Sequence, residues 1–170
     1  MSSLRWLLGA DEALLVRITR LQAPHLTSLM LALTRIGDAE SWFVLGFLLL
    51  GTSGLEMALR LAVGALGATL PVQLLKRSLR RKRPTVRIAG FFALDPDPDA
   101  FSFPSGHTAT AFGVGLSLLA GHSTLAGPAL ALAAGIGVSR VYLGAHYPLD
   151  VAAGAVLGSF GALASRLLLG

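Results

Sequence analysis

The stretch from Ser139 to Asp150 carries three side chains whose types and spacing suit chemistry. It reads SRVYLGAHYPLD and contains Arg140, His146 and Asp150. Pro148 suits the first turn of a helix, which would put His146 just before that helix and Asp150 in its first turn. A carboxylate there can fix the imidazole tautomer and make the other ring nitrogen a better nucleophile. Taken singly, Asp150 could instead complement the helix dipole, and Arg140 could reach toward lipid headgroups.

A second segment, FSFPSGHTA at residues 101–109, has the pattern of a helix N-terminus, because Pro, Ser and Gly precede a long apolar run. Unpaired N–H groups and the positive end of the helix dipole make such a terminus an anion site. Ser105 would add a hydroxyl, Gly106 would let a ligand approach the backbone closely, and His107 would lie in the first turn. For this segment alone, a capping Ser105 and an interfacial His107 are the better explanation.

A third segment, KRSLRRKRP at residues 76–84, could hold cations at a defined place. Lys76 and Arg83 are two helical turns apart and so share one helix face. Pro84 pushes Arg83 toward extended backbone and stops the helix. Alone, the run is better explained as a collar of headgroup-reaching side chains, a positive-inside signal, or a patch for anionic lipid or nucleic acid.

The composition indicates that lipid surrounds much of the chain. Of 170 residues, 54% are hydrophobic and 14% are charged, and the mean hydropathy is +0.69. Soluble domains usually carry about a quarter charged residues. The length suits one domain, residues 1–170. The absence of cysteine excludes disulfide and thiolate sites. The first ten residues lead into Asp11 and Glu12 without a long apolar region, so we expect no cleavable signal peptide.

The apolar segments predict an all-α integral membrane helical bundle with about six transmembrane segments. A spanning helix needs about 20 mostly apolar residues. The first segment is the weakest, because charged residues, a proline and a histidine interrupt it, and it is either an imperfect span or an interfacial helix. Glycines in the last three segments are expected to let helices pack closely. The candidates are residues 12–35, 39–53, 56–75, 149–169 and the two halves of 107–139, divided near 121–128.

Alternation of these segments across the membrane brings the polar joints to one side. Residues 76–106, 140–148 and the turn at 37–40 would then share one membrane face. Burying charged groups at membrane depth costs on the order of several kcal/mol each unless they are paired or solvated. An anionic ligand between the three segments would offset that cost.

The three segments resemble the signature of the type 2 phosphatidic acid phosphatase superfamily. Its first motif is Lys, six residues, then Arg-Pro; its second is Pro-Ser-Gly-His; its third is Ser-Arg, five residues, His, three residues, Asp. All three are complete and in order, and they cover about residues 70–169. The matching residues are Lys76, Arg83-Pro84, Pro104-Ser105-Gly106-His107, Ser139-Arg140, His146 and Asp150.

The resemblance implies a role for each motif residue. His146 would attack phosphorus to form a phosphohistidine, Asp150 would orient it, and His107 would protonate the leaving group. Fixed cations can stabilise the charge on the equatorial oxygens, and the family needs neither Mg²⁺ nor a cofactor. The residues implied to bind the phosphoryl oxygens are Lys76, Arg83, Arg140, Ser105 and the backbone N–H of Gly106.

The implied function is hydrolysis of a lipid phosphomonoester or diphosphate, of the undecaprenyl diphosphate, phosphatidylglycerol phosphate or phosphatidate class. Its partners would be that lipid and the bilayer, without nucleic acid. The family places its site on the extracytoplasmic face, here of a bacterial inner membrane, although this puts the basic residues 76–87 outside, against the positive-inside tendency. The alternatives are a vanadate-dependent haloperoxidase-like enzyme, a non-catalytic binder of anionic lipid with a dispensable His146, and a pore or transporter.

The run DPDPD, with Asp95, Asp97 and Asp99, looks like a metal or aspartyl-phosphate motif. Its alternating prolines predict an extended polar loop instead. A calcium loop starting at Asp95 would need Gly and Glu where Ala100 and Gly106 stand. We therefore expect no metal site, a loop at 85–103 that shapes the substrate entrance, and retained activity after replacement of all three Asp by Asn.

Overall fold

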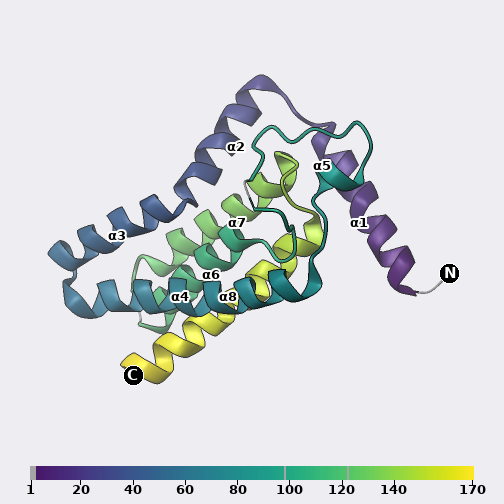
Figure 1. The fold of residues 1–170 in the computed structure, drawn as a ribbon. Coiled ribbons are helices and arrows are strands. Elements are labelled where there is room, and N and C mark those ends of the chain that lie inside the picture. Colours follow the sequence, from purple (N-terminus) through teal and green to yellow (C-terminus); the bar gives the residue numbers. More distant parts are fainter. Residues whose placement is uncertain (1–2, 98, 122) are drawn as a thin grey trace.

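The computed structural model describes residues 3–97, 99–121 and 123–170, and over these ranges it contains helices and no strand (Figure 1). The predicted all-α fold class is therefore confirmed. The helices of the described ranges are α1 (Ser3–Thr19), α2 (Pro24–Ile36), α3 (Ala39–Thr52), α4 (Gly54–Leu79), α5 (Pro84–Arg87), α6 (Gly106–Ala120), α7 (Ala126–Tyr142) and α8 (Pro148–Leu169).

Helices α4, α6 and α8 pack against one another at the centre, and α7 lies on α6. Helix α2 packs on α7, and helix α3 packs on α4. Glycines permit the close approach that was predicted. A Cβ added at Gly161 would lie 2.1 Å from the carbonyl oxygen of Gly64. One added at Gly154 would lie 2.6 Å from the carbonyl oxygen of Ser105, so the last helix passes directly beside the second motif. Small residues thus bring the motif-bearing helices together.

The predicted first segment, residues 12–35, is not one helix. The chain breaks after α1, and α2 begins at Pro24 with Ala23 in extended backbone. Proline disfavours helical backbone in the residue before it, which explains the break. The break is held by Tyr142, whose carbonyl oxygen accepts from Gln22 at 2.7 Å and whose hydroxyl accepts the N–H of Ala23 at 2.9 Å. The helix α1 therefore lies at the far end of the bundle from α3 (Figure 1).

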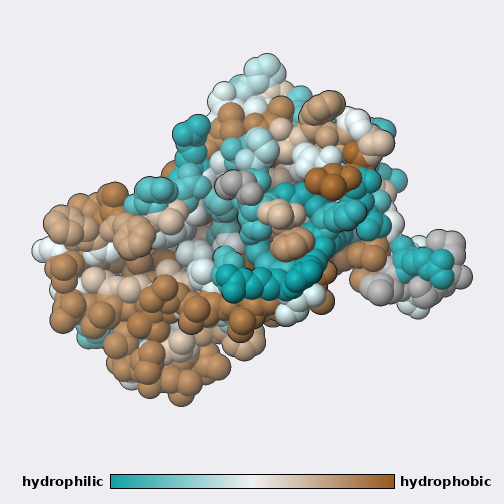
Figure 2. All heavy atoms as spheres, in the orientation of Figure 1, coloured by the Kyte–Doolittle hydropathy of each residue, from teal (hydrophilic) through white to brown (hydrophobic). Residues whose placement is uncertain are grey.

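The outer surface fits a chain embedded in a membrane. Among the described residues, α4 and α8 are the two helices long and apolar enough to cross a bilayer; α3 is apolar but shorter. Figure 2 shows apolar side chains gathered over α3, α4 and the C-terminal end of α8, whereas polar ones gather at the opposite end. The protein is thus an integral membrane helical protein, and the count of six spans stays a prediction.

The polar end contains the joints between the long helices. The chain leaves α4, enters α6, leaves α7 and enters α8 at this same end (Figure 1). Ion pairs join these joints to one another, including those of Arg81 with Asp150 and of Arg140 with Asp97. The expected meeting of the three polar segments is found in the structure.

Candidate active site

His146 lies in the loop before α8 and is fully buried. As expected, Pro148 occupies the first turn of α8 and Asp150 follows in that turn. Asp150 Oδ2 accepts the backbone N–H of Tyr147 at 3.0 Å and lies 3.5 Å from His146 Nδ1. The last distance suits an ion pair and is long for a hydrogen bond, and such contacts commonly tighten only when substrate binds. Asp150 is therefore placed beside one ring nitrogen of His146.

The other ring nitrogen of His146 faces cations. His146 Nε2 lies 3.4 Å from Arg83 Nη1, which also donates to the carbonyl oxygen of Ala145 at 3.0 Å. Arg83 has the extended backbone that Pro84 predicted. Lys76 and Arg83 are each 6% exposed and Arg140 is 1% exposed. Cations buried to this extent need anionic partners, so this cluster is an anion site in chemical character.

The second motif lies between the other two. The backbone N–H of Ser105 donates to the carbonyl oxygen of Asp150 at 2.9 Å, which ties the start of α6 to α8. The Ser105 hydroxyl accepts from Thr108 Oγ1 at 2.9 Å and makes no hydrogen bond that caps the helix. Ser105 therefore occupies the N-cap position of α6, as expected, but its hydroxyl does not cap the helix. A Cβ built on Gly106 meets no atom closer than 4.0 Å, so space remains beside that backbone.

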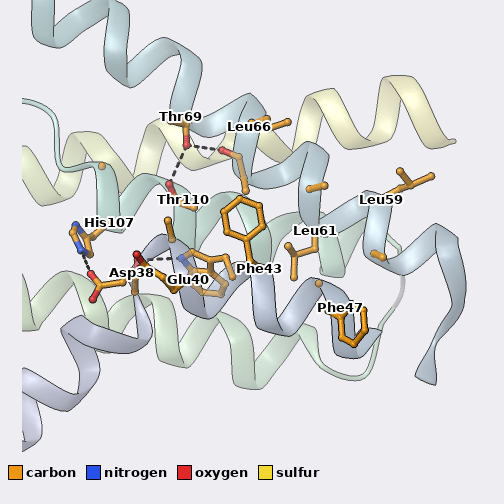
Figure 3. Close-up of a pocket in the computed structure, with 18 of the residues that line it drawn as sticks. Asp38, Glu40, Phe43, Phe47, Leu59, Leu61, Leu66, Thr69, His107 and Thr110 are labelled. Carbon is orange, nitrogen blue, oxygen red and sulfur yellow. Dashed lines mark hydrogen bonds and ion pairs between the residues drawn. The ribbon is translucent and has the colours of Figure 1, made fainter. Parts of the chain in front are cut away.

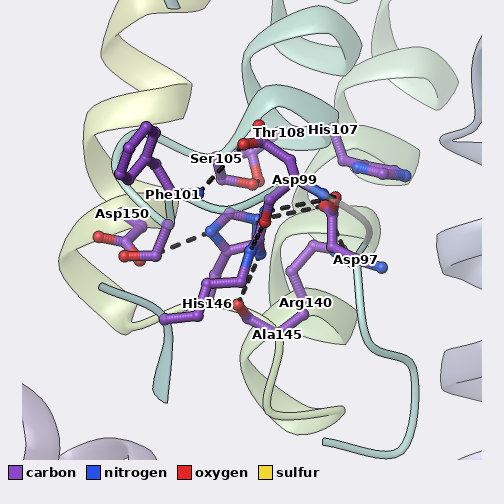
Figure 4. Close-up of polar contacts among 12 residues, drawn as sticks. Asp97, Asp99, Phe101, Ser105, His107, Thr108, Arg140, Ala145, His146 and Asp150 are labelled. Atoms are coloured by element: carbon purple, nitrogen blue, oxygen red, sulfur yellow. Dashed lines mark hydrogen bonds and ion pairs between the residues drawn. The ribbon is translucent and has the colours of Figure 1, made fainter. Parts of the chain in front are cut away.

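The run DPDPD, here called the acidic loop (residues 95–99 without residue 98), lies on these cations (Figure 4). Asp95 Oδ2 is 2.6 Å from Arg140 Nη1, Asp97 Oδ1 is 3.2 Å from Arg83 Nη2, and Asp99 pairs with Lys76. Asp97 Oδ2 also lies 3.8 Å from His146 Nε2. Loop carboxylates therefore pair with each of the three buried cations.

The charges around the acidic loop favour its ionised form. Burial by itself would raise the pKa of Asp97, but the contact with His146 and the charge of Arg83 lower it well below its usual range. Burial likewise opposes ionisation of Asp99, and its bond with Lys76 lowers the pKa of that carboxyl overall. Burial also lowers the pKa of Arg83, against the attraction of Asp97 and Asp99. The loop and the cations form a charge-balanced cluster.

Sequence reasoning missed several partners of the motif residues. Asp38, in the turn between α2 and α3, lies 2.9 Å from His107 Nε2. Thr34 of α2 accepts a hydrogen bond from Arg140. Arg81 Nη1 donates to Asp150 Oδ1 at 2.7 Å. The turn at 37–40 was expected on this face, which hinted at Asp38, whereas Arg81 could not be distinguished within the basic run.

An apolar groove of about 750 Å³ leads from the lipid-facing side to this cluster. Helices α3 and α4 form its walls with aromatic and aliphatic side chains, among them Phe43, Phe47 and Leu66 (Figure 3). Its inner end is lined by Lys76, Asp97, Gly106 and His107. The groove can therefore hold a hydrocarbon chain while an attached anion reaches the buried cations.

Known proteins match this chain over much of its length. The family model described as the PAP2 superfamily matches residues 57–169. An undecaprenyl-diphosphatase of Sulfolobus acidocaldarius is 29% identical over 160 residues, which are 90% of this chain and 75% of that protein. Other curated relatives are matched over smaller parts, and this chain spans between 30% and 52% of their lengths.

Two solved structures share the fold. The crystal structure of Aquifex aeolicus LpxE has a TM-score of 0.80 and 28% identity, and the match covers 90% of this chain and 92% of that one. The first transmembrane PAP2 type phosphatidylglycerolphosphate phosphatase from Bacillus subtilis has a TM-score of 0.76 and 25% identity, with 98% and 86% covered.

Proposed function

Because this chain belongs to the PAP2 superfamily, we propose that it is a membrane lipid phosphatase that hydrolyses a phosphomonoester or diphosphate of a lipid. The relatives named above act on such lipids. One observation carries the proposal: an apolar groove ends at buried cations beside a buried His–Asp pair. Neither a passive lipid binder nor a pore requires His146 next to Asp150.

The first chemical step is transfer of the phosphoryl group to His146. The lone pair of Nε2, which faces the cation cluster, attacks phosphorus while Asp150 stands at Nδ1. A P–N bond forms, and the bond from phosphorus to the leaving oxygen breaks with its electron pair. His107, at the inner end of the groove, gives that oxygen a proton. The second step is attack by water, which His107 deprotonates, and the P–N electron pair returns to His146.

The cations supply most of the stabilisation in this mechanism. Phosphoryl transfer depends mainly on positioning and on charge stabilisation at the equatorial oxygens. Arg83 and Arg140 offer planar forks that match those oxygens, and Lys76 adds a point charge. Ser105 and the N–H of Gly106 complete the set of proposed phosphate ligands. In this proposal no divalent metal takes part, because fixed cations perform its role.

The substrate class and the membrane face are also part of the proposal. The aliphatic and aromatic lining of the groove suits an isoprenyl or acyl chain, which fits the undecaprenyl diphosphate, phosphatidylglycerol phosphate and phosphatidate classes. Following the family, we place the site on the extracytoplasmic face of a bacterial inner membrane. Ion pairing of the basic residues with the acidic loop lessens the conflict with the positive-inside tendency.

Phosphate release in EDTA tests this function. Detergent-solubilised wild type and His146→Ala would be compared on a panel of lipid mono- and diphosphates. His25→Ala, a change at an exposed histidine of α2, is the matched control. We expect wild type and His25→Ala to release phosphate and His146→Ala to lose at least about 10⁴-fold in kcat. Activity that survives in His146→Ala, or that needs added Mg²⁺, would contradict the mechanism.

A further inference from the structure

The second oxygen of Asp150, the one turned away from His146, is held by a chain of two further side chains. Arg81 Nη1 donates to Asp150 Oδ1 at 2.7 Å, and Arg81 Nη2 donates to Asp11 Oδ2 at 2.6 Å. Asp11 belongs to α1, and its other oxygen accepts the backbone N–H of Leu149 at 2.9 Å. A single guanidinium therefore bridges two carboxylates, of which Asp11 is 4% and Asp150 0% exposed.

Arg81 is also fixed from its flat side. Its guanidinium carbon lies 3.9 Å from the centre of the Tyr147 ring, and Tyr147 is fully buried directly after His146. Stacking on an aromatic face and two carboxylate bonds leave a planar fork little freedom. Burial raises the pKa of Tyr147 to about 12, so this ring stays neutral under Arg81. The orientation of Arg81 is thus determined by contacts on three sides.

We propose that Arg81 and Asp11 are positioning residues that hold the Asp150 carboxylate in the plane in which it meets His146. A carboxylate on a short side chain can rotate, and one oxygen pinned by Arg81 leaves the other directed at His146 Nδ1 and the Tyr147 N–H. Asp11 balances the charge of Arg81, so that Arg81 does not draw Asp150 away from His146. This inference rests on the proposed function, because it assigns a purpose to orienting His146.

The competing explanation is that Asp11 only attaches α1 to the bundle. The neighbouring residue Glu12 provides a comparison, because it pairs with Arg87 of α5 and so also attaches α1. That pair is more exposed, with side chains 28% and 48% accessible, and Asp150 is not among its partners. If attachment were the only role, loss of either pair would affect stability and leave kcat unchanged.

The test compares Asp11→Asn and Arg81→Lys with Glu12→Gln in the full chain, with dioctanoyl phosphatidate and farnesyl diphosphate as probes. We expect Asp11→Asn to lower kcat between about 10-fold and 100-fold, because small misplacements in a site cost that much. KM should change less than about threefold, since neither residue contacts the phosphate ligands. Arg81→Lys keeps the charge without the fork, so it should lower kcat at near-normal melting temperature. Glu12→Gln should keep the wild-type kcat.

A second measurement does not depend on turnover. In protein labelled with ¹⁵N-histidine, nitrogen NMR reports the tautomer of His146, which His146→Ala identifies by loss of its signals. We expect wild type and Glu12→Gln to carry the proton on Nδ1 and Asp11→Asn to show a mixture of tautomers. An unchanged kcat in an active protein, or the same tautomer in Asp11→Asn, would overturn the positioning role. Wild type that hydrolyses no lipid phosphate would instead overturn the proposed function.

Discussion

His107 depends on a carboxylate that comes from a different part of the chain. Asp38 Oδ1 lies 2.9 Å from His107 Nε2, and its own side chain is 45% exposed. Burial and the charge of Arg140 favour neutral His107, and the contact with Asp38 holds one ring nitrogen and opposes that effect. In the proposed mechanism, Asp38 would therefore support the donation of a proton from His107 to the leaving oxygen.

Asp38→Asn should slow hydrolysis in a way that depends on the leaving group. We expect kcat to fall about 10-fold to 100-fold with an alkyl phosphate, whose leaving oxygen needs a proton. With p-nitrophenyl phosphate the fall should be threefold or less, because that leaving group departs as an anion. Arg35→Gln, at an exposed position of α2 that does not line the groove, is the control and should match wild type. Equal losses on both substrates would argue against the acid-supporting role.

In the proposed mechanism Asp97 and the substrate compete for the same cations, so removal of the Asp97 charge should change KM. A substrate anion must displace Asp97 from these largely buried cations, so Asp97→Asn should lower KM by about fivefold or more. The variant in which Asp95, Asp97 and Asp99 are all replaced by Asn should also remain active. Steady-state kinetics with one lipid phosphate would measure the KM of Asp97→Asn and the kcat of the triple variant. Loss of activity in the triple variant would show that the loop carboxylates are needed for the chemistry.

The pH dependence of Asp97→Asn follows from the direction in which the pKa of Asp97 is shifted. The pKa of Asp97 lies below its ordinary value of about 4, so the pairing of Asp97 with the cations is complete above about pH 4. The pairing is lost only as the pH falls through the lowered pKa. Asp97 therefore does not titrate between pH 5 and 8. We expect plots of kcat/KM against pH for wild type and Asp97→Asn to contain the same number of inflections over this range, because Asp97 adds none of its own. The profile of Asp97→Asn should move toward lower pH, since the charge of Asp97 favours protonated His107. An inflection present in wild type and absent from Asp97→Asn would mean that Asp97 titrates in the assay range.

At the scale of the helices, close packing of α4, α6 and α8 decides where the motifs stand. The tightest contact is at Gly161, where an added Cβ would meet the backbone of Gly64. Backbone cannot move aside as a flexible side chain can, so substitution here must separate α8 from α4. Because α8 carries Asp150 at its start, the separation would reach the site as well.

Gly161→Ala should destabilise the bundle by about 1–3 kcal/mol, the usual cost of overpacking. Thermal unfolding in detergent, followed by circular dichroism, would measure the change. Gly127→Ala in α7 is the control, because no atom lies within 4 Å of the Cβ added there. If the two variants unfold at the same temperature, the helices are less tightly packed at Gly161 than the structure shows.

The helices that carry motifs were predictable because their ends are marked in the sequence. Pro148 and Asp150 mark the start of α8, and Gly121–Pro128 marks the break between α6 and α7. The break between α1 and α2 also has a local cause, Pro24, but residues 12–35 were interpreted as one segment. Ion pairs such as Asp38–His107 join distant residues and leave no periodic signal, so sequence reasoning missed them.

At the scale of the whole molecule, the polar joints and the C-terminal ends of α6 and α8 lie at opposite ends of the bundle (Figure 1). The proposed orientation puts the polar joints outside the cytoplasm. The 170 residues contain no cysteine, so single introduced cysteines can report the orientation without background labelling from these residues. Two exposed positions are suitable: Ala100, near the acidic loop, and Thr124, between α6 and α7.

In intact spheroplasts a membrane-impermeant maleimide should label Ala100→Cys and not Thr124→Cys. Labelling of both after detergent lysis would show that each thiol is reactive. The opposite pattern in intact cells would place the site on the cytoplasmic side, where the positive-inside tendency puts basic residues 76–87.

The acidic loop also bears on how the product leaves. Its carboxylates are tethered beside the cations, so they act at an effective concentration in the millimolar range, whatever the surroundings contain. Free inorganic phosphate would stay bound only at a concentration above the effective concentration of the loop carboxylates. A lipid substrate bound in the groove would instead present its phosphate at a high local concentration. We expect weak product inhibition in the wild type, because the loop refills the site as each phosphate departs.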